Sequence, residues 1–144
     1  MNSVLNNSND ISLFLKDHGI KPSYQRLKIY SFLLENRIHP TVDTIYKNLC
    51  PEIPTLSKTT VYNTLNLFIQ KNIIQKLVIE ETETRYDVNI SIHGHFKCEK
   101  CGEVYDIFLE DNLLNSPILK NFKVNETHLY FKGVCEKCID SIKK

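Results

Sequence analysis

The first half of the chain alternates short amphipathic stretches with proline, glycine and polar breaks. Apolar residues recur at helical spacing in four stretches, so the pattern predicts four short helices over residues 11–18, 23–36, 42–50 and 58–72. Residues suited to capping precede three of them: Asp10 or Asn9, Thr41 and Ser57. Between the second and third helices, the proline after His39 favours an extended backbone at His39.

Two runs of β-forming residues follow the helices. IIQKLVIE and TRYDV are separated by the polar turn ETE, and this arrangement predicts a β-hairpin. Short helices followed by a hairpin are typical of a winged helix-turn-helix, in which the second helix of the pair enters the major groove of DNA. Here that helix would begin after Ser57. The alternative interpretation is a small helical core with solvated polar faces.

The first turns of this helix carry the side chains that nucleic-acid contacts need. Hydroxyl and basic groups suit phosphate oxygens, whereas tyrosine and asparagine can contact base edges. The candidates for DNA binding are Arg26, Ser57, Lys58, Thr60, Tyr62 and Asn63. For Tyr62 the alternative is packing in the core.

The charge distribution supports a local basic patch but excludes a uniformly basic coat. The 144 residues carry 18 Lys and Arg against 17 Asp and Glu, for a formal net charge of +1. Residues 21–76 nevertheless hold eight basic side chains against three acidic ones. We find no signal peptide and no apolar run long enough to cross a bilayer, so we expect a cytoplasmic protein that binds no membrane.

The second half of the chain contains two Cys-x-x-Cys pairs, Cys98 with Cys101 and Cys135 with Cys138. Four thiolates in two such knuckles predict a closed tetrahedral zinc site with a structural role. A redox pair or free buried cysteines are the alternatives. Cys50 precedes Pro51 at a helix end and is most simply a packing residue.

A chemically different group of residues combines imidazoles with carboxylates. His93 and His95 lie two residues apart on an extended segment, so their rings share one face. Together with His39, Asp87 and Asp106 they could supply ligands that suit Fe(II), Mn(II) or Zn(II) better than Cu(I). Each residue also has a simpler interpretation: a loop histidine, a turn aspartate, a salt-bridge partner, or a variant zinc-finger segment for the His-x-His.

Longer motifs carry a resemblance to a known family. KPSYQRLKIYSFL, HPTVDTIY, SKTTVYNTLNLF, TRYDVNISIHGHFKCEKCGEVYDI and GVCEKC resemble, in the same order, the ferric uptake regulator family, and most closely its peroxide-sensing branch. The resemblance implies an α+β protein with a winged helix-turn-helix over residues 1–86 and an α/β dimerisation domain over 87–144. It also implies a homodimer that is not an enzyme and that represses transcription from a palindromic operator in double-stranded DNA.

The resemblance also assigns the metal sites. It places structural zinc on the four cysteines and regulatory iron or manganese on His39, Asp87, His93, His95 and Asp106. Asp106, where iron-uptake regulators tend to have glutamate, favours peroxide sensing, in which Fe(II) reacts with hydrogen peroxide and a ligand histidine is oxidised. By position the candidates for oxidation are His39 and His93. Thr127 occupies the place of a further histidine ligand, so His128, one residue later, is expected not to form a third site.

Three other functions remain as alternatives. An iron-responsive regulator would share the fold and the ligands, and a zinc- or nickel-uptake regulator would hold a different ion. A zinc-stabilised interaction module without a DNA target is the alternative of another class. A metallohydrolase is disfavoured because the chain has no HExxH-type motif and the four-cysteine site has no open position.

Overall fold

The computed structural model describes residues 7–78, 83–91, 93–108, 116–124 and 127–142 of the chain. The fold divides into two compact units, residues 1–90 and 91–144, and each is described by itself. The sequence-based boundary lay at 86/87. The difference arises because residues 85–87 form a strand that pairs within the first unit.

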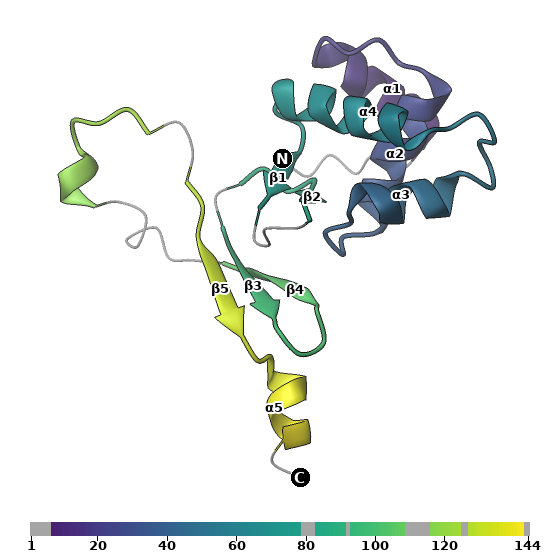
Figure 1. Ribbon diagram of the computed structural model, residues 1–144. Helices are drawn as coiled ribbons and strands as arrows, with labels where there is room; N and C mark the ends of the chain where they lie inside the picture. Colours follow the sequence, from purple (N-terminus) through teal and green to yellow (C-terminus); the bar gives the residue numbers. More distant parts are fainter. Residues whose placement is uncertain (1–6, 79–82, 92, 109–115, 125–126, 143–144) are drawn as a thin grey trace. The chain divides into compact units, whose positions relative to one another are not determined.

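Four helices make up most of the first unit (Figure 1): α1 Ser8–Asp17, α2 Tyr24–Glu35, α3 Val42–Leu49 and α4 Lys58–Gln70. The predicted caps of α3 and α4 are confirmed, because the Thr41 and Ser57 side chains accept the N–H groups of Thr44 and Thr60. The predicted cap of α1 was wrong. The helix begins three residues earlier, since Asn7 has the extended backbone of a capping residue and accepts the N–H of Asp10.

The apolar faces of the four helices meet in one hydrophobic core. Its buried residues include Ile11, Leu15, Ile29, Tyr30, Leu33, Ile45, Leu49, Val61, Leu65 and Phe68. The helical spacing in the sequence identified most of these positions. Tyr24, at the start of α2, is instead 60% exposed, and its ring centre lies 5.9 Å from the Lys28 ammonium. Packing of α4 in this core fixes which of its side chains are buried and which are exposed.

The predicted hairpin is confirmed by strands β1 (Gln75–Leu77) and β2 (Arg85–Asp87), which pair antiparallel. Residues 79–82, which are the end of the first predicted strand and the first two residues of the predicted turn, lie outside the described residues. Tyr86 is buried in the helical core, and its N–H donates to the carbonyl of Pro40 at 3.1 Å. The hairpin is therefore tied to the loop that carries His39.

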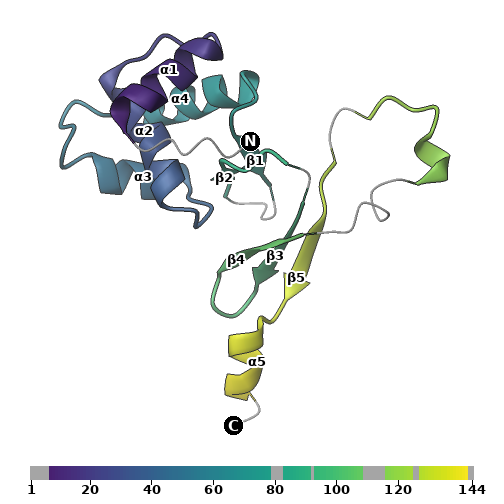
Figure 2. The same ribbon diagram turned by 180° about the vertical axis from the view of Figure 1, so that it is seen from behind.

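The second unit is a small mixed sheet with the order β4-β3-β5 (Figure 2). Strand β3 (Gly94–Cys98) pairs antiparallel with β4 (Val104–Ile107) and parallel with β5 (Tyr130–Gly133). The 3-10 helix η2 (Pro117–Leu119) precedes β5, and helix α5 (Glu136–Ile142), which the sequence pattern did not predict, follows it. Several large apolar side chains of this unit are exposed, including Phe108, Ile118 and Phe122. Among its described residues, the buried apolar side chains are those of Cys98 and Cys135.

The cap of α4 leads to a stability prediction. Replacing Ser57 by alanine removes the acceptor of the Thr60 N–H, which lies 3.0 Å from Ser57 Oγ. We expect a loss of about 1 kcal/mol in the free energy of unfolding of the helical unit. Urea denaturation followed by circular dichroism measures it. Thr59, two residues later, is exposed, so Thr59→Ala is the matched control. It should lower the free energy of unfolding by less than Ser57→Ala does. Equal stability of Ser57→Ala and the wild type would contradict the capping role.

Candidate metal centres and nucleic-acid interface

The four cysteines of the second unit come together as the spacing predicted. All four sulfur atoms lie within 4.8 Å of one another. The distance is 3.8 Å between the sulfurs of Cys98 and Cys138 and also between those of Cys101 and Cys135. A tetrahedron of sulfurs with metal–sulfur bonds of about 2.3 Å has edges of about 3.8 Å. The site therefore has the dimensions that a zinc ion requires.

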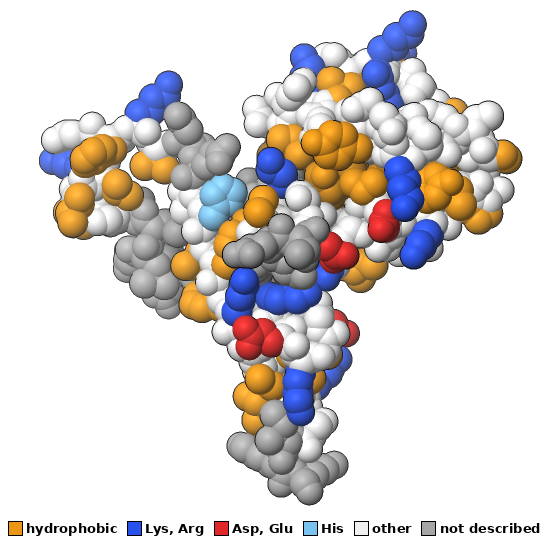
Figure 3. Space-filling view, in the orientation of Figure 1, with side chains coloured by type: hydrophobic (Ala, Val, Ile, Leu, Met, Phe, Trp, Pro, Cys, Tyr) orange, Lys and Arg blue, Asp and Glu red, His pale blue; other side chains and the backbone are white. Residues whose placement is uncertain are grey.

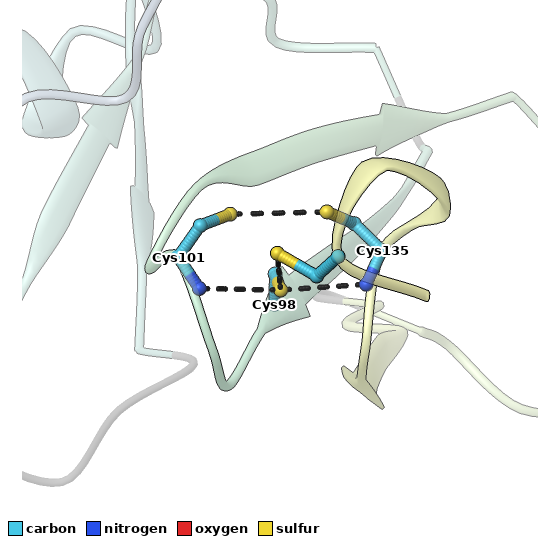
Figure 4. Close-up of side chains that lie close together, drawn as sticks. Cys98, Cys101 and Cys135 are labelled. Atoms are coloured by element: carbon cyan, nitrogen blue, oxygen red, sulfur yellow. Dashed lines mark hydrogen bonds between the residues drawn. The ribbon is translucent and has the colours of Figure 1, made fainter. Parts of the chain in front are cut away.

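Backbone groups hold Cys98 at the centre of this cluster. Its sulfur accepts the N–H groups of Cys101 at 3.4 Å and Cys135 at 3.3 Å (Figure 4). These two donors lower the pKa of Cys98 to about 6. Hydrogen bonds with neighbouring thiol groups, of which the one with Cys135 has the largest effect, raise the pKa of Cys138 to about 12. Four thiolates together therefore need a cation among them.

The turn between Cys98 and Cys101 has a defined geometry. Gly102 follows it with a φ of +81°, a conformation that favours glycine. The Gly102 N–H donates to the Cys98 carbonyl at 3.0 Å, and the Lys97 ammonium donates to the Gly102 carbonyl at 2.9 Å. These two hydrogen bonds hold the turn between Cys98 and Gly102 in a fixed conformation.

The second unit also brings together His93, His95 and Asp106. Asp106 lies opposite His95 in the β3–β4 pair. One carboxylate oxygen of Asp106 lies 3.3 Å from His93 Nε2 and 3.4 Å from His95 Nε2, and the two rings are 4.3 Å apart. Ligand atoms that share an ion at about 2.0–2.2 Å lie about 3 to 3.6 Å apart. The three side chains therefore fit part of the coordination shell of one ion.

The tautomer of His93 suits metal binding. Its Nδ1 lies 2.7 Å from the carbonyl oxygen of Ser91. A carbonyl can only accept, so Nδ1 carries a proton, which leaves Nε2 as the nitrogen that faces Asp106 and could bind an ion. Sequence reasoning missed Ser91, because a main-chain acceptor leaves no mark in the residue types.

The remaining two candidate ligands, His39 and Asp87, form a pair within the first unit. His39 Nε2 lies 3.4 Å from Asp87 Oδ2, and both side chains are about 95% buried. The other carboxylate oxygen of Asp87 accepts the N–H of Asn89 at 2.9 Å, which fixes the orientation of the group. A buried imidazole beside a buried carboxylate supplies one nitrogen and one oxygen ligand for a divalent ion.

The backbone at His39 differs from the expected extended conformation. Its φ is +57°, in the left-handed region that few non-glycine residues adopt. Two contacts from β2 hold the loop in this form: the Arg85 guanidinium donates to the His39 carbonyl at 3.3 Å, and the Tyr86 N–H donates to Pro40. The preference of residues before proline was thus overridden by hydrogen bonds to a distant strand. Arg85 was not a sequence-based candidate, although it lies two residues before Asp87.

Three of the proposed DNA-binding residues line one pocket of the first unit. Arg26, Thr60 and Asn63 meet there with Lys21, in a depression of about 660 Å³. Tyr62 is 52% exposed, so the core alternative for this residue was wrong. On the face drawn in Figure 3, the basic side chains form separate groups rather than a continuous belt, in keeping with the small net charge.

Three of the DNA-binding candidates, Arg26, Ser57 and Lys58, already have intramolecular partners. The Lys58 ammonium lies 3.0 Å from Asp43 Oδ1, and Arg26 donates to the carbonyl of Lys21 at 2.7 Å. Ser57 is occupied as the cap of α4. Asp43 was not a sequence-based candidate, and its contact with Lys58 was missed.

Two further residues, Cys50 and His128, lie outside the clusters. Cys50 is half-buried at the end of α3, with its sulfur 3.7 Å from the Lys47 carbonyl. His128 is exposed and forms a hydrogen bond with the Tyr130 hydroxyl, and it joins none of the metal-type groups found among the described residues. In that part of the chain, we also find no helix that is long and apolar enough to span a bilayer.

A helical unit with a β-hairpin wing, together with clusters of metal-ligand side chains, defines a metal-responsive transcriptional regulator of the winged-helix class. The family model of the ferric uptake regulators matches residues 17–132. This protein therefore belongs to the ferric uptake regulator family. Members of that family regulate transcription and are not enzymes.

Individual relatives include both branches named in the sequence analysis. The peroxide-responsive repressor PerR of Staphylococcus aureus strain Mu50 is 33% identical over 129 residues, which cover 88% of this chain and 87% of the relative. The ferric uptake regulator of Vibrio cholerae has a similar structure, with a TM-score of 0.70 and 28% identity over 86% of this chain and 98% of that one. PerR of Streptococcus pyogenes matches with a TM-score of 0.52 and 27% identity over 91% and 92% of the two chains.

Proposed function

We propose that this protein is a metal-dependent repressor that senses peroxide through iron or manganese held by His39, Asp87, His93, His95 and Asp106. The observation that carries the proposal is the cluster in which the Nε2 atoms of His93 and His95 both lie within 3.4 Å of one Asp106 oxygen. The 33% identity to a peroxide-responsive repressor supports the peroxide branch. Zinc on the four cysteines would have a structural role.

In this proposal one ion takes ligands from both units of the chain. His39 and Asp87 belong to the first unit, and the other three ligands belong to the second. Such an ion favours whichever arrangement of the units lets all five side chains reach it, so the metal shifts the population toward that arrangement. A homodimer in that arrangement would place two α4 helices on half-sites about one helical turn apart, or a multiple of it, in a palindromic operator.

Bound Fe(II) would supply the electron that activates hydrogen peroxide. The chain's own part would be to supply the imidazoles of His39 and His93 as ligands, which would expose them to oxidation at the ion. An imidazole that has gained oxygen is a poorer ligand, so the ion would be lost and the repressor would leave its operator. Mn(II) would support the same DNA binding with a weak response to peroxide.

The deciding experiment compares the iron-loaded and manganese-loaded proteins on DNA. The probe is a labelled duplex selected by the wild-type protein from a randomised pool. Peroxide is expected to release the iron-loaded protein and leave the manganese-loaded protein bound. An iron-responsive regulator, the second candidate, is favoured by the similarity to the Vibrio cholerae structure. It predicts that both loaded forms stay bound after peroxide.

The chemistry of sensing leads to a separate prediction. Mild peroxide treatment of the iron-loaded protein should add the mass of one oxygen atom to a peptide that contains His39 or His93. Tandem mass spectrometry after proteolysis locates the added atom, and the manganese-loaded protein treated in parallel is the control. Oxidation confined to the four cysteines would point instead to a thiol switch.

A further inference from the structure

We propose that Asp43 competes with DNA phosphate for Lys58 and thereby limits the affinity of α4 for DNA. The inference extends the proposed function, since it takes α4 as the helix that contacts DNA. Lys58 is the first residue of α4, and its ammonium lies 3.0 Å from Asp43 Oδ1 on α3. The same ammonium lies 5.7 Å from the centre of the Tyr46 ring. The site where a phosphate would approach is therefore occupied by a carboxylate of the protein itself.

The exposure of this pair argues against a mainly structural role. The Lys58 and Asp43 side chains are 56% and 62% exposed. Pairs that exposed contribute little to stability, because water and salt screen them. Asp43 also gains from its place in the first turn of α3, but that interaction with the helix dipole does not require Lys58. Stability alone therefore does not account for the contact.

The positive charge at the N-terminus of α4 makes the pair of Lys58 and Asp43 relevant to DNA binding. The N-terminus of α4 bears a partial positive charge, and Lys58 adds a full charge at the same place. A phosphate that binds there must displace the Asp43 carboxylate and then lie close to its negative charge. Both effects weaken binding. Removing the charge of Asp43 should therefore tighten binding, whereas most surface changes on a DNA-binding face weaken it or have no effect.

A second lysine–carboxylate pair in the same unit supplies a matched control. Lys28 on α2 lies 2.8 Å from Glu52, with side chains 35% and 56% exposed. Glu52→Gln makes the same change in net charge and also releases a lysine, but neither residue belongs to α4. If net charge alone governed affinity, the two variants would behave alike.

The test measures fluorescence anisotropy of the manganese-loaded full-length variants over a series of salt concentrations. The probe is the duplex selected by the wild-type protein from a randomised pool. Asp43→Asn is expected to tighten binding about two- to fivefold per protomer. The slope of log affinity against log salt should steepen by about 0.9 per protomer, since Lys58 would then release a further counterion. Glu52→Gln should leave both quantities unchanged.

A double-mutant cycle tests whether the effect passes through Lys58. In the Lys58→Met background, Asp43→Asn should lose most of its effect. Asp43→Ser, which keeps a small polar side chain in the first turn of α3, should reproduce the gain if the asparagine variant folds poorly. Unchanged or weaker binding by folded Asp43 variants would overturn this inference alone, as would an equal gain in Glu52→Gln. Failure of the wild-type protein to select any duplex would overturn the proposed function and this inference with it.

Discussion

Replacing Cys98 by serine is expected to unfold the 91–144 unit and abolish its zinc binding. The Cys98 sulfur lies 3.8 Å from that of Cys138 and accepts two backbone N–H groups from the other knuckle residues. The unit has little else to stabilise it, because its buried apolar side chains among the described residues are those of Cys98 and Cys135. Structural zinc sites of this kind contribute about 10–16 kcal/mol of apparent folding free energy. Losing a ligand therefore removes most of what holds the sheet.

The measurement combines zinc content with the dispersion of amide signals from residues 91–144 in a heteronuclear NMR spectrum of the full chain. Cys50→Ser is the matched control, because Cys50 is half-buried in the first unit and takes no part in the cluster. It should keep one zinc ion per chain in the four-cysteine site. A Cys98→Ser protein that retained this zinc and a dispersed spectrum would contradict the structural role of the site.

Replacing His39 by alanine is expected to abolish metal-dependent DNA binding while the zinc site stays intact. His39 is a ligand of the proposed regulatory ion, and its Nε2 lies 3.4 Å from Asp87. Loss of a residue that merely orients a ligand already costs 10- to 100-fold in metal affinity, so loss of the ligand itself should cost at least about 100-fold. Manganese titration followed by electron paramagnetic resonance measures the affinity, and anisotropy with the selected duplex measures DNA binding.

Two further variants separate ligand loss from other effects. His39 has a φ of +57°, so alanine also introduces backbone strain. Asparagine tolerates this conformation, and His39→Asn should show the same loss of metal affinity with a normally folded helical unit. His128→Ala removes an exposed imidazole of the second unit and should behave as the wild type. Wild-type DNA binding by a manganese-saturated His39 variant would refute the role of the ion.

The helical unit was largely predictable, because its elements are set by local patterns. Apolar spacing identified the faces of α1 to α4, and the caps at Thr41 and Ser57 were identified from residue type alone. At the first helix the sequence NNSND offers several capping residues in a row, and only the backbone angles select Asn7. The backbone at His39 was predicted wrongly because local preference was overridden by contacts from Arg85 and Tyr86.

The four-cysteine site was predictable from the sequence, whereas the contacts within the other candidate sites were not. The spacing of the cysteines predicted the four-sulfur cluster, since two knuckles have few ways to meet. The grouping of His93 and His95 with Asp106 depends on the register of β3 and β4, which the sequence does not fix. The contact between Asp43 and Lys58 depends on how α3 packs on α4, so no periodicity could reveal it.

The hydrogen bond that orients His93 joins two roles in one peptide group. Ser91, whose carbonyl accepts the imidazole proton, is the first residue of the second unit. Rotation of that peptide would withdraw the acceptor and let the ring swing away from Asp106. The orientation of a proposed metal ligand therefore depends on one main-chain carbonyl, so a change in the backbone at Ser91 would weaken binding of an ion at the proposed site.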